Sequence, residues 1–352
     1  MIEIVALPGD GIGPEVMAEA IACLELLSAD HDLDLRFTEH DFGGAAIDRH
    51  GDPLPPETLE ACRSSAAVFM GAVGGDRWRE APVQPAAGLA RLREELGLFA
   101  NLRPAKVLGG LQHASPLRPD IAKDADVLLV RALRSAVDPE ACGREEIERV
   151  AHAAFRSARH RRRKVTSVDR ANMLAASRLW RSTVVKVAAQ YADVELEHLY
   201  VDECAMALVT GPRRFDVILT ENLFADILSD QLFLIAGSVG LLGSASLGDG
   251  GPGLFGPTQG AAHPIAGLNV ANPAGAIASA IMMLDELGLG DSGRLLSDAL
   301  DTTLREGCRT ADLGGTSTCS EFGARVRQNL QRSLGRFSAF RQLIAMNRGC
   351  CG

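Results

Sequence analysis

Several features that would assign a protein to a membrane, secreted or zinc-binding class are missing from this 352-residue sequence. The longest apolar run, residues 232–243, contains three glycines and a serine and falls short of the ~20 apolar residues that a membrane helix needs. The chain begins with an acidic Glu3 and has no basic segment followed by an apolar one, so no secretory signal is expected. We therefore expect a cytoplasmic protein that does not bind membranes.

The sequence also lacks the charge and the cysteine spacing of two other classes. A net charge of −9 argues against nucleic-acid binding, which needs many Lys and Arg facing phosphates. The one basic run, residues 159–164, is interpreted as a helix end, where cations complement the helix dipole. The eight cysteines include no C-x-x-C pair. Reduced thiols are expected, with only Cys350 and Cys351 exposed.

Short apolar runs alternate with helix-length amphipathic segments, which is typical of an α/β protein with a largely parallel sheet. Strands are expected at 2–7, 66–73, 126–131, 164–169, 194–202 and 215–222, and helices at 14–28, from about 144, and at 173–190, 274–288, 291–306 and 319–333. The glycine-rich segment 238–260 is expected to be a long functional loop.

The segment 9–15 (GDGIGPE) places a glycine turn between a strand and a helix, as nucleotide-binding segments do. Its glycines do not follow the G-x-G-x-x-G spacing, and Pro14 is also what an ordinary helix start would use. The segment by itself fits a nucleotide-binding turn or a plain tight turn.

Asp226 and Asp230 lie four residues apart, so both carboxylates project from one face of a helix. Mg²⁺ and Mn²⁺ prefer such oxygen ligands, and Asp202, at the end of an expected strand, is a candidate third ligand. A solvated acidic face is the alternative.

Arg93, Arg103 and Arg131 fall in a helix, a loop and a strand end. Guanidinium groups bind carboxylates bidentately, so converging arginines would bind a dicarboxylate. Three separate surface arginines would give the same spacing.

Together these segments resemble the isocitrate/isopropylmalate family of metal-dependent β-decarboxylating dehydrogenases. The resemblance is collinear over about residues 2–333, and LFANLRPAKV (98–107) favours the isopropylmalate branch. The segment 98–107 is part of the longer match LREELGLFANLRPAKV (92–107). The other matching segments are LPGDGIGPEV (7–16), GAVGG (71–75), KVTSVDRANMLAASRLWR (164–181), VELEHLYVD (194–202), FDVILTENLFADILSD (215–230), GSASLGDGGPGL (243–254), IAGLNVANPAGAIASA (265–280) and RTADLGGTST (309–318). The tail after Ser333 lies outside the resemblance.

The resemblance implies a homodimer of two-domain α/β subunits whose fold is not a Rossmann fold. Residues 1–98 plus 237–352 would form the large domain on the nucleotide side, and residues 99–236 the second domain, which carries the substrate and metal residues and the dimer contacts. Boundaries fall near residues 98 and 236.

The resemblance also implies roles for the candidate residues. Arg93, Arg103 and Arg131 would bind the malate carboxylates, and Leu89 would contact the alkyl group of the substrate. Mg²⁺ or Mn²⁺ would be held by two aspartates of one subunit and one of its partner: Asp226 and Asp230, with Asp202 across the interface. The implied reaction is the NAD-dependent oxidation and β-decarboxylation of a 2-hydroxy dicarboxylate in leucine biosynthesis.

This sequence departs from the family at both proton-transfer groups. The family base is a lysine in V-D-K-A-N, whereas this chain has Arg170 in VDRAN. Arginine stays protonated in proteins and cannot act as a base. The family acid is a tyrosine in a G-G-I-Y loop that is absent here after Arg131. Neither Tyr191 nor Tyr200 is placed to take over.

The nucleotide segment departs as well, because GPTQGAAHPIAG replaces E-P-x-H-G-S-A-P-D-I-A-G. Pro264 occupies the position of the aspartate that contacts the adenosine ribose, and Gly256 and Gln259 replace a glutamate and a histidine. We expect weakened NAD binding with NADP not excluded. The retained cofactor candidates are Gly11, Ile12, Gly74, Gly75, His263 and Asn272.

Three outcomes stay open: an enzyme with residual or altered activity, a silent paralogue that binds Mg²⁺ and a malate-like acid or pairs with an active homologue, and a decaying gene product. The retained arginines and aspartates argue against decay.

Overall fold

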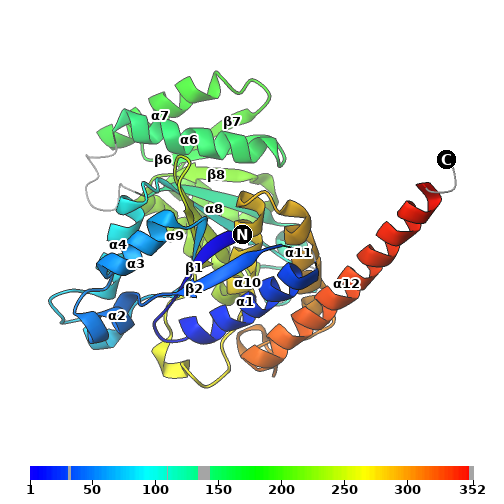
Figure 1. Cartoon of the computed structure of the whole chain (residues 1–352). Coiled ribbons are helices and arrows are strands. Elements are labelled where there is room, and N and C mark those ends of the chain that lie inside the picture. The colour runs from blue at the N-terminus through cyan, green and yellow to red at the C-terminus, as the bar shows by residue number, and fades with distance from the viewer. Residues whose placement is uncertain (31–32, 109, 134–142, 349–352) are drawn as a thin grey trace.

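A computed structural model describes residues 1–30, 33–108, 110–133 and 143–348, with side chains described to residue 335. It contains a ten-stranded sheet with the order β2-β1-β3-β10-β9-β4-β5-β8-β6-β7 (Figure 1). Six of its strand pairs are parallel and three are antiparallel. The expected α/β fold with a mixed, largely parallel sheet is confirmed.

The strands are short, as is usual for a buried sheet. They are β1 (Ile2–Gly9), β2 (Leu35–Glu39), β3 (Ala67–Ala72), β4 (Ala100–Lys106), β5 (Asp126–Ala132), β6 (Lys164–Asp169), β7 (Glu195–Tyr200), β8 (Val217–Thr220), β9 (Gly243–Leu247) and β10 (Gly253–Pro257).

The α-helices lie on both sides of this sheet. They are α1 (Gly13–Asp30), α2 (Gly43–His50), α3 (Pro56–Ser64), α4 (Pro85–Glu95), α5 (Pro119–Ala122), α6 (Arg144–Arg159), α7 (Ala175–Ala188), α8 (Val201–Thr210), α9 (Asn222–Ala236), α10 (Ala274–Glu286), α11 (Gly290–Arg305) and α12 (Cys319–Arg348). Helix α12 continues the segment expected at 319–333 and runs beyond the other helices (Figure 1). None of the helices in the described ranges is both long and apolar enough to cross a membrane.

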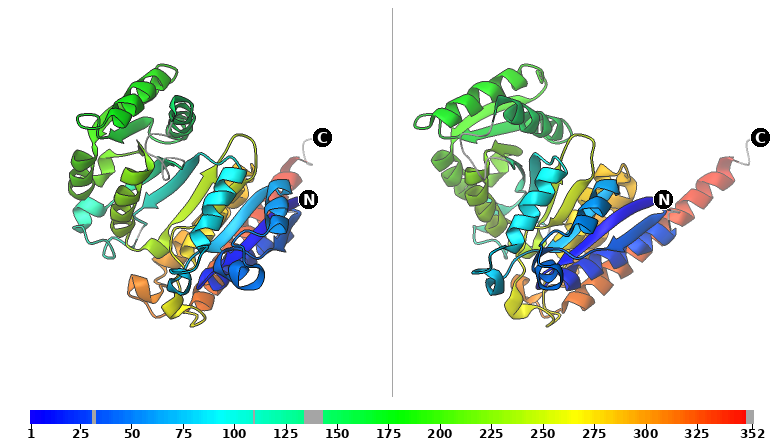
Figure 2. Two further views of the ribbon diagram at one scale, coloured as in Figure 1. Left: turned by 90° about the vertical axis from the view of Figure 1, so that its left-hand side faces the viewer. Right: turned by 60° about the vertical axis from the view of Figure 1, so that its left-hand side comes forward.

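The strand order separates the two sequence regions that were expected to form different domains. Strands β2, β1, β3, β10 and β9 come from residues 1–98 and 237–352, and β4, β5, β8, β6 and β7 come from residues 99–236. The two sets of strands meet where β9 pairs antiparallel with β4. Figure 2 shows that the two sequence regions extend from this junction toward opposite ends of the molecule. The division into two domains stays a prediction.

The expectation of a long loop at 238–260 was wrong. This segment forms β9 and β10 in the middle of the sheet. Its glycines serve close packing: a Cβ on Gly256 would lie 2.6 Å from the carbonyl oxygen of Met70, and one on Gly243 would lie 2.6 Å from the backbone nitrogen of Ser279. Glycine can therefore mark close backbone approach within a strand rather than a loop.

The expected strand at 194–202 was too long. Strand β7 ends at Tyr200, and α8 begins at Val201. Asp202 consequently lies in the first turn of a helix, not at a strand end, where its negative charge complements the helix dipole.

The basic run at residues 159–164 begins at the end of a helix, as expected. Helix α6 ends at Arg159, whose guanidinium forms a bidentate ion pair with Asp193. Arg161 donates to the buried Asp216 at 2.8 Å. Arg159, Arg161 and Lys164 of this run are thus paired with carboxylates within the chain.

The cysteines in the described residues are unpaired thiols, as expected. Cys23, Cys62, Cys204 and Cys319 are buried and Cys308 is partly buried. Cys142, Cys350 and Cys351 lie outside the described residues.

Candidate active site

Two of the three candidate arginines lie side by side in the sheet. Arg103 is in β4 and Arg131 in β5, and these strands are antiparallel neighbours in which Asn101 is the register partner of Arg131. The side-chain oxygen of Asn101 accepts hydrogen bonds from the Nε of Arg103 at 2.9 Å and from the Nε of Arg131 at 3.0 Å. One buried amide therefore orients both guanidinium groups.

Helix α9 supplies the negative charge next to these arginines. Arg131 forms a hydrogen-bonded ion pair with Asp226, and Nη1 of Arg103 lies 3.9 Å from the same carboxylate. Arg103 also donates to Ser229 at 2.8 Å. Asp230 is exposed one turn after Asp226 on this helix, as the four-residue spacing predicted.

Burial disfavours the charged form of the clustered arginines. Desolvation, followed by repulsion from Arg131, lowers the pKa of Arg93 to about 10 and that of Arg103 to about 9, while Asp226 acts in the opposite direction. The Nε of Arg93 is buried and has no hydrogen-bond partner among the described residues. Three cations close to one another, with Asp226 and Asp230 as the neighbouring carboxylates, leave an excess of positive charge, which favours binding of an anion.

Leu89 lies one turn before Arg93 on α4 and is half-buried. It packs against the hydrophobic cluster that contains Leu92, Leu98 and Leu133.

Arg170 and Asp202 meet at the carboxyl ends of β6 and β7. Arg170 directly follows β6, Asp202 is in the first turn of α8, and the two side chains form an ion pair. Both strands run parallel, with Asp169 in register with Tyr200, so the two segments leave the same edge of the sheet. The side chain of Asp202 is 59% exposed.

The three candidate metal ligands are not gathered in one chain. Among the described residues, no group of three or more His, Cys, Asp and Glu side chains is arranged to hold a metal ion. Asp226 and Asp202 are each 59% exposed, and each has an arginine as its ion-pair partner. Exposed carboxylates of this kind fit a hard divalent cation such as Mg²⁺ or Mn²⁺, provided that the third ligand comes from a second copy of the chain.

Neither Lys164 nor Tyr191 takes the place of the missing proton-transfer groups. Lys164, at the beginning of β6, pairs with Glu195 and Glu197, at the opposite end of the strand from Arg170. Tyr191 is buried and hydrogen-bonds to His152. The segment where the family has its tyrosine loop, residues 134–142, lies outside the described residues.

The segment expected to bind the nucleotide is held against the amino-terminal glycine turn. The amide of Ile12 donates to the carbonyl of Ala261 at 2.8 Å. Gly11 has φ +58°, and a Cβ there would lie 1.8 Å from the same carbonyl oxygen. Glycine is thus required at this position by both conformation and space.

His263 joins the other pair of candidate glycines to this segment. Its Nε2 lies 2.7 Å from the carbonyl oxygen of Gly74, and a Cβ on Gly75 would lie 2.2 Å from the same nitrogen. Asn272 is buried and donates to Asp312 at 3.0 Å. Pro264 is exposed beside His263, so the position of the family aspartate faces solvent.

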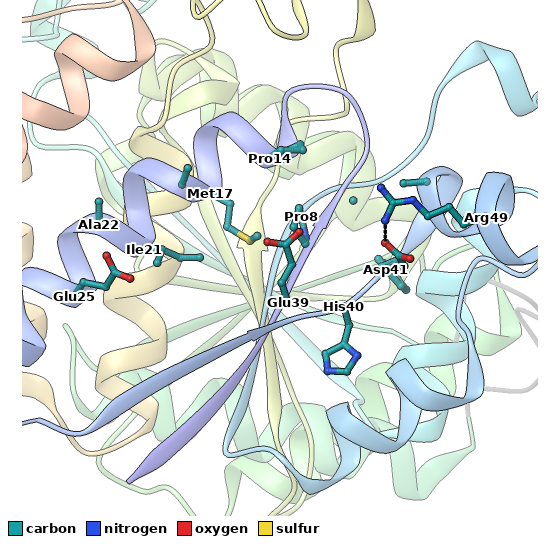
Figure 3. Close-up of a pocket in the computed structure, with 14 residues that line it drawn as sticks. Pro8, Pro14, Met17, Ile21, Ala22, Glu25, Glu39, His40, Asp41 and Arg49 are labelled. Atoms are coloured by element: carbon teal, nitrogen blue, oxygen red, sulfur yellow. Dashed lines mark hydrogen bonds and ion pairs between the residues drawn. The ribbon is translucent and has the colours of Figure 1, made fainter.

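A cavity of about 510 Å³ lies apart from the arginine cluster, between α1 and the segment that joins β2 to α2. Figure 3 shows Met17 and Ile21 of α1 on one side and His40 and Asp41 on the other. Asp41 is neutralised by an ion pair with Arg49. None of the arginine or aspartate candidates lines this cavity.

Sequence reasoning missed Asn101 and Ser229, which hold the arginines. The signal for Asn101 is its place two residues before Arg103, since alternate residues of a strand share a face. Ser229 has a comparable signal, because it is three residues after Asp226 on a helix. Neither asparagine nor serine binds carboxylates as arginine does, so residue type alone does not identify Asn101 or Ser229 as part of the site.

Known proteins resemble this chain over most of its length. A family model for isocitrate/isopropylmalate dehydrogenase matches residues 3–135 and 132–326. The 3-isopropylmalate dehydrogenase of Listeria innocua is 44% identical over 94% of this chain and 98% of that protein. That of Clostridium pasteurianum is 46% identical over 88% of this chain and 93% of that protein.

Solved structures resemble the whole chain as well. Isocitrate dehydrogenase from Methylococcus capsulatus superimposes with a TM-score of 0.83 at 29% identity, covering 94% of this chain and 99% of that one. A β-decarboxylating dehydrogenase from Thermococcus kodakarensis gives 0.80 at 32% identity, with coverages of 94% and 97%. With a matching family model over most of its length and relatives above 40% identity, this chain belongs to the isocitrate/isopropylmalate dehydrogenase family.

Proposed function

We propose that this protein is an isopropylmalate-type β-decarboxylating dehydrogenase that still binds a malate-type dicarboxylate and a divalent metal, but whose turnover is strongly reduced. The observation that carries the proposal is the pair Arg103 and Arg131, held by Asn101 around Asp226. Relatives of this chain are 3-isopropylmalate dehydrogenases. The proposed substrate is therefore a 2-hydroxy dicarboxylate, and the proposed pathway is leucine biosynthesis.

The arginines would bind and orient the two carboxylates of this substrate. Asn101 fixes the Nε of Arg103 and of Arg131, while Nη1 of Arg103 donates to Ser229 and Nη1 of Arg131 to Asp226. Nη2 of each guanidinium would bind a carboxylate, and a bidentate contact through both terminal nitrogens would require Nη1 to leave its present partner. Arg93, with an unpartnered Nε, adds a third cation. Leu89 would contact the alkyl group, since it lies one helical turn from Arg93.

Asp226 and Asp230, with Asp202 of the partner subunit, would hold Mg²⁺ or Mn²⁺. When bound, such a cation supplies a Lewis acid that stabilises negative charge on an oxygen of the substrate during oxidation and decarboxylation. Its binding requires Asp226 to exchange the Arg131 contact for metal, and Asp202 to exchange that of Arg170.

A homodimer is supported by an apolar surface on two adjacent helices. Helices α8 and α9 pack on one another and expose five large apolar side chains, which we call the α8–α9 apolar face: Met206, Val209, Leu223, Ile227 and Leu234. We also propose that the subunit has two domains: a large domain of residues 1–98 and 237–352, and a second domain of residues 99–236. The α8–α9 apolar face belongs to the second domain. Exposed apolar residues in such a group are typical of protein–protein contact.

Proton transfer is where function would be lost. Arg170 stays protonated and can hold a carboxylate but cannot accept a proton, and the family tyrosine has no counterpart in sequence. Each general acid or base contributes ~10²–10⁴ in rate. A silent paralogue, or a partner subunit for an active homologue, is the second candidate. The ion pair between Arg170 and Asp202 favours it, because Arg170 competes with the metal for that carboxylate.

The proposed nucleotide is NAD, bound weakly because Pro264 replaces a carboxylate. Pro264 offers no cation for the additional phosphate of NADP, and NADP stays open because the neighbouring His263 could contact that phosphate. Gly11, Ile12, Gly74, Gly75, His263 and Asn272 are the proposed contacts. His263 already bonds to Gly74, so a nucleotide phosphate would compete with this contact.

Complementation between two defective chains tests the shared site. We would co-express Asp226→Asn and Asp202→Asn chains and measure Mn²⁺ binding by calorimetry in the presence of 3-isopropylmalate. Each variant alone should bind no metal. The mixture should regain about a quarter of the sites of the unmodified protein, because half of the dimers are mixed and each has one intact site. No regained site in the mixture would overturn the shared-site arrangement.

A further inference from the structure

The guanidinium of Arg181, on α7, binds the last residue of β6. Asp169 is fully buried and receives two parallel hydrogen bonds from Arg181, Nε to Oδ2 at 2.8 Å and Nη2 to Oδ1 at 2.9 Å. Its Oδ1 also accepts the amide of Ala171 at 2.8 Å. The carboxylate of Asp169 therefore fixes the backbone on both sides of Arg170.

The same guanidinium reaches the last residue of β7. The Cζ of Arg181 lies 5.0 Å from the centre of the Tyr200 ring, a distance typical of a cation–π contact. Tyr200 is the register partner of Asp169 and the N-cap residue of α8, and its amide donates to Glu203 at 3.1 Å. Arg181 thus contacts the residue at which β7 ends and α8, the helix that carries Asp202, begins.

We propose that Arg181 is a positioning residue, which fixes Arg170 and Asp202 relative to one another for use in the partner's active site. This inference rests on the proposed function, in which both residues face the metal and the dicarboxylate of the other subunit. The two segments leave adjacent strand ends. Apart from Arg181, the ion pair between Arg170 and Asp202 is the only side-chain link between residues 169–171 and 200–203 in the described part of the chain. Arg181 itself touches neither metal nor substrate.

The chain offers a control with the same chemistry at the opposite edge of the sheet. Arg159 forms a bidentate ion pair with Asp193, and its Cζ lies 4.5 Å from the Tyr191 ring. Residues 159 and 193 precede β6 and β7, whereas residues 169 and 200 end them. Removing Arg159 therefore removes an ion pair and a ring contact without touching the carboxyl ends of the strands.

The experiment compares Arg181→Met, Arg181→Lys and Arg159→Met in the full chain. Arg181→Met leaves the buried Asp169 without its cation and can impair folding, so the double variant Asp169→Asn/Arg181→Met, which has no unpaired charge, is included. The first readout is amide hydrogen exchange of peptides covering 169–175 and 200–205. The second is the Kd for Mn²⁺ in the presence of 3-isopropylmalate, by calorimetry.

We expect faster exchange in both peptides of Arg181→Met and of the double variant, and a Kd for Mn²⁺ raised on the order of 10–100-fold, as for residues that orient metal ligands. Arg181→Lys keeps the charge and should recover part of the affinity. Arg159→Met should match the unmodified protein in both readouts.

The inference would be overturned if either peptide exchanged at an unchanged rate in Arg181→Met and in the double variant. It would also be overturned if Arg181→Met and Arg159→Met had equal effects. The proposed function fails separately, if the unmodified protein binds no Mn²⁺ with 3-isopropylmalate. In that case the exchange experiment still decides whether Arg181 holds the two segments together.

Discussion

Arg170 forms an ion pair with Asp202 of the same chain, at the carboxyl ends of two neighbouring parallel strands. One residue occupies the position of the family base and the other that of a metal ligand. The replacement of lysine by arginine thus keeps the positive charge beside this aspartate but removes the ability to release a proton near neutral pH. Binding and proton transfer are separated by this change.

The amide of Asn101 is predicted to control dicarboxylate affinity. Asn101→Leu removes the acceptor shared by Arg103 and Arg131, and should raise the Kd for 3-isopropylmalate on the order of tenfold or more, because hydrogen bonds to charged groups contribute about 1.5–3 kcal/mol each. Calorimetry in the presence of Mg²⁺ measures this. Asn329→Leu is the control: Asn329 is buried and bonded to Thr303 but belongs to α12, so it should lower stability and leave the Kd unchanged. Equal Kd values for the two variants would contradict the role of Asn101.

Dicarboxylate binding is predicted to require a divalent metal. Asp226, Asp230 and Asp202 of the partner subunit would repel the substrate carboxylates without a cation between them. Calorimetric titrations of 3-isopropylmalate with Mg²⁺ and with EDTA should give a measurable Kd only with the metal. Equal affinity in EDTA would show that the arginines suffice and would remove the metal from the account.

Weak binding of NAD⁺ without a preference for NADP⁺ is predicted, because Pro264 replaces the aspartate that contacts the ribose and no cation stands beside it. Pro264→Asp should increase NAD⁺ affinity and leave NADP⁺ affinity unchanged or lower. Fluorescence titration of both nucleotides measures this. Low-micromolar NAD⁺ binding by the unmodified chain would mean that another contact has replaced the carboxylate.

His198 is predicted to make the fold less stable in mild acid. Burial, reinforced by the charge of Arg181 and opposed by Asp169, lowers the pKa of His198 in the folded chain below its ordinary value of 6.5. The unfolded chain then binds more protons between the folded pKa and 6.5, so this contribution to stability is present above pH 6.5 and is lost as the pH falls toward the folded pKa. Urea unfolding at pH 8 and pH 5.5 should show a smaller loss of stability for His198→Gln than for the unmodified chain. Equal losses would exclude His198 as a source of the pH dependence.

The fold was largely predictable because its strands and helices carry strong local patterns. Runs such as 2–7 and 164–169 are rich in β-branched residues and of strand length, and each precedes a helical segment. The segment 238–260 was not predictable in this way, because its glycines indicate a loop locally and are explained only by neighbours such as Met70 and Ser279. The end of β7 was misplaced for a similar reason, since Val201 is apolar but begins a helix.

The site was predictable where side-chain chemistry alone identifies a role. The spacing of Asp226 and Asp230 on one helix gave a testable pair, and the family resemblance located the arginines. The contacts between side chains were not predictable. Nothing in the sequence shows that Asn101 bonds to both Arg103 and Arg131, or that Arg181 contacts the ring of Tyr200. These contacts depend on strand register, which is set by the packing of the whole sheet.

Steady-state oxidation of 3-isopropylmalate with NAD⁺ and Mg²⁺ or Mn²⁺ tests the central claim, that binding is retained while proton transfer is lost. We predict that the unmodified chain turns over far below the 1–10³ s⁻¹ common among enzymes. Arg170→Lys alone should help little, whereas Arg170→Lys combined with a G-G-I-Y loop grafted after Arg131 should raise the rate well above either change alone, because groups that act as a unit give non-additive effects. Turnover of the unmodified chain within the ordinary range would contradict the account and would require another residue to supply the proton chemistry.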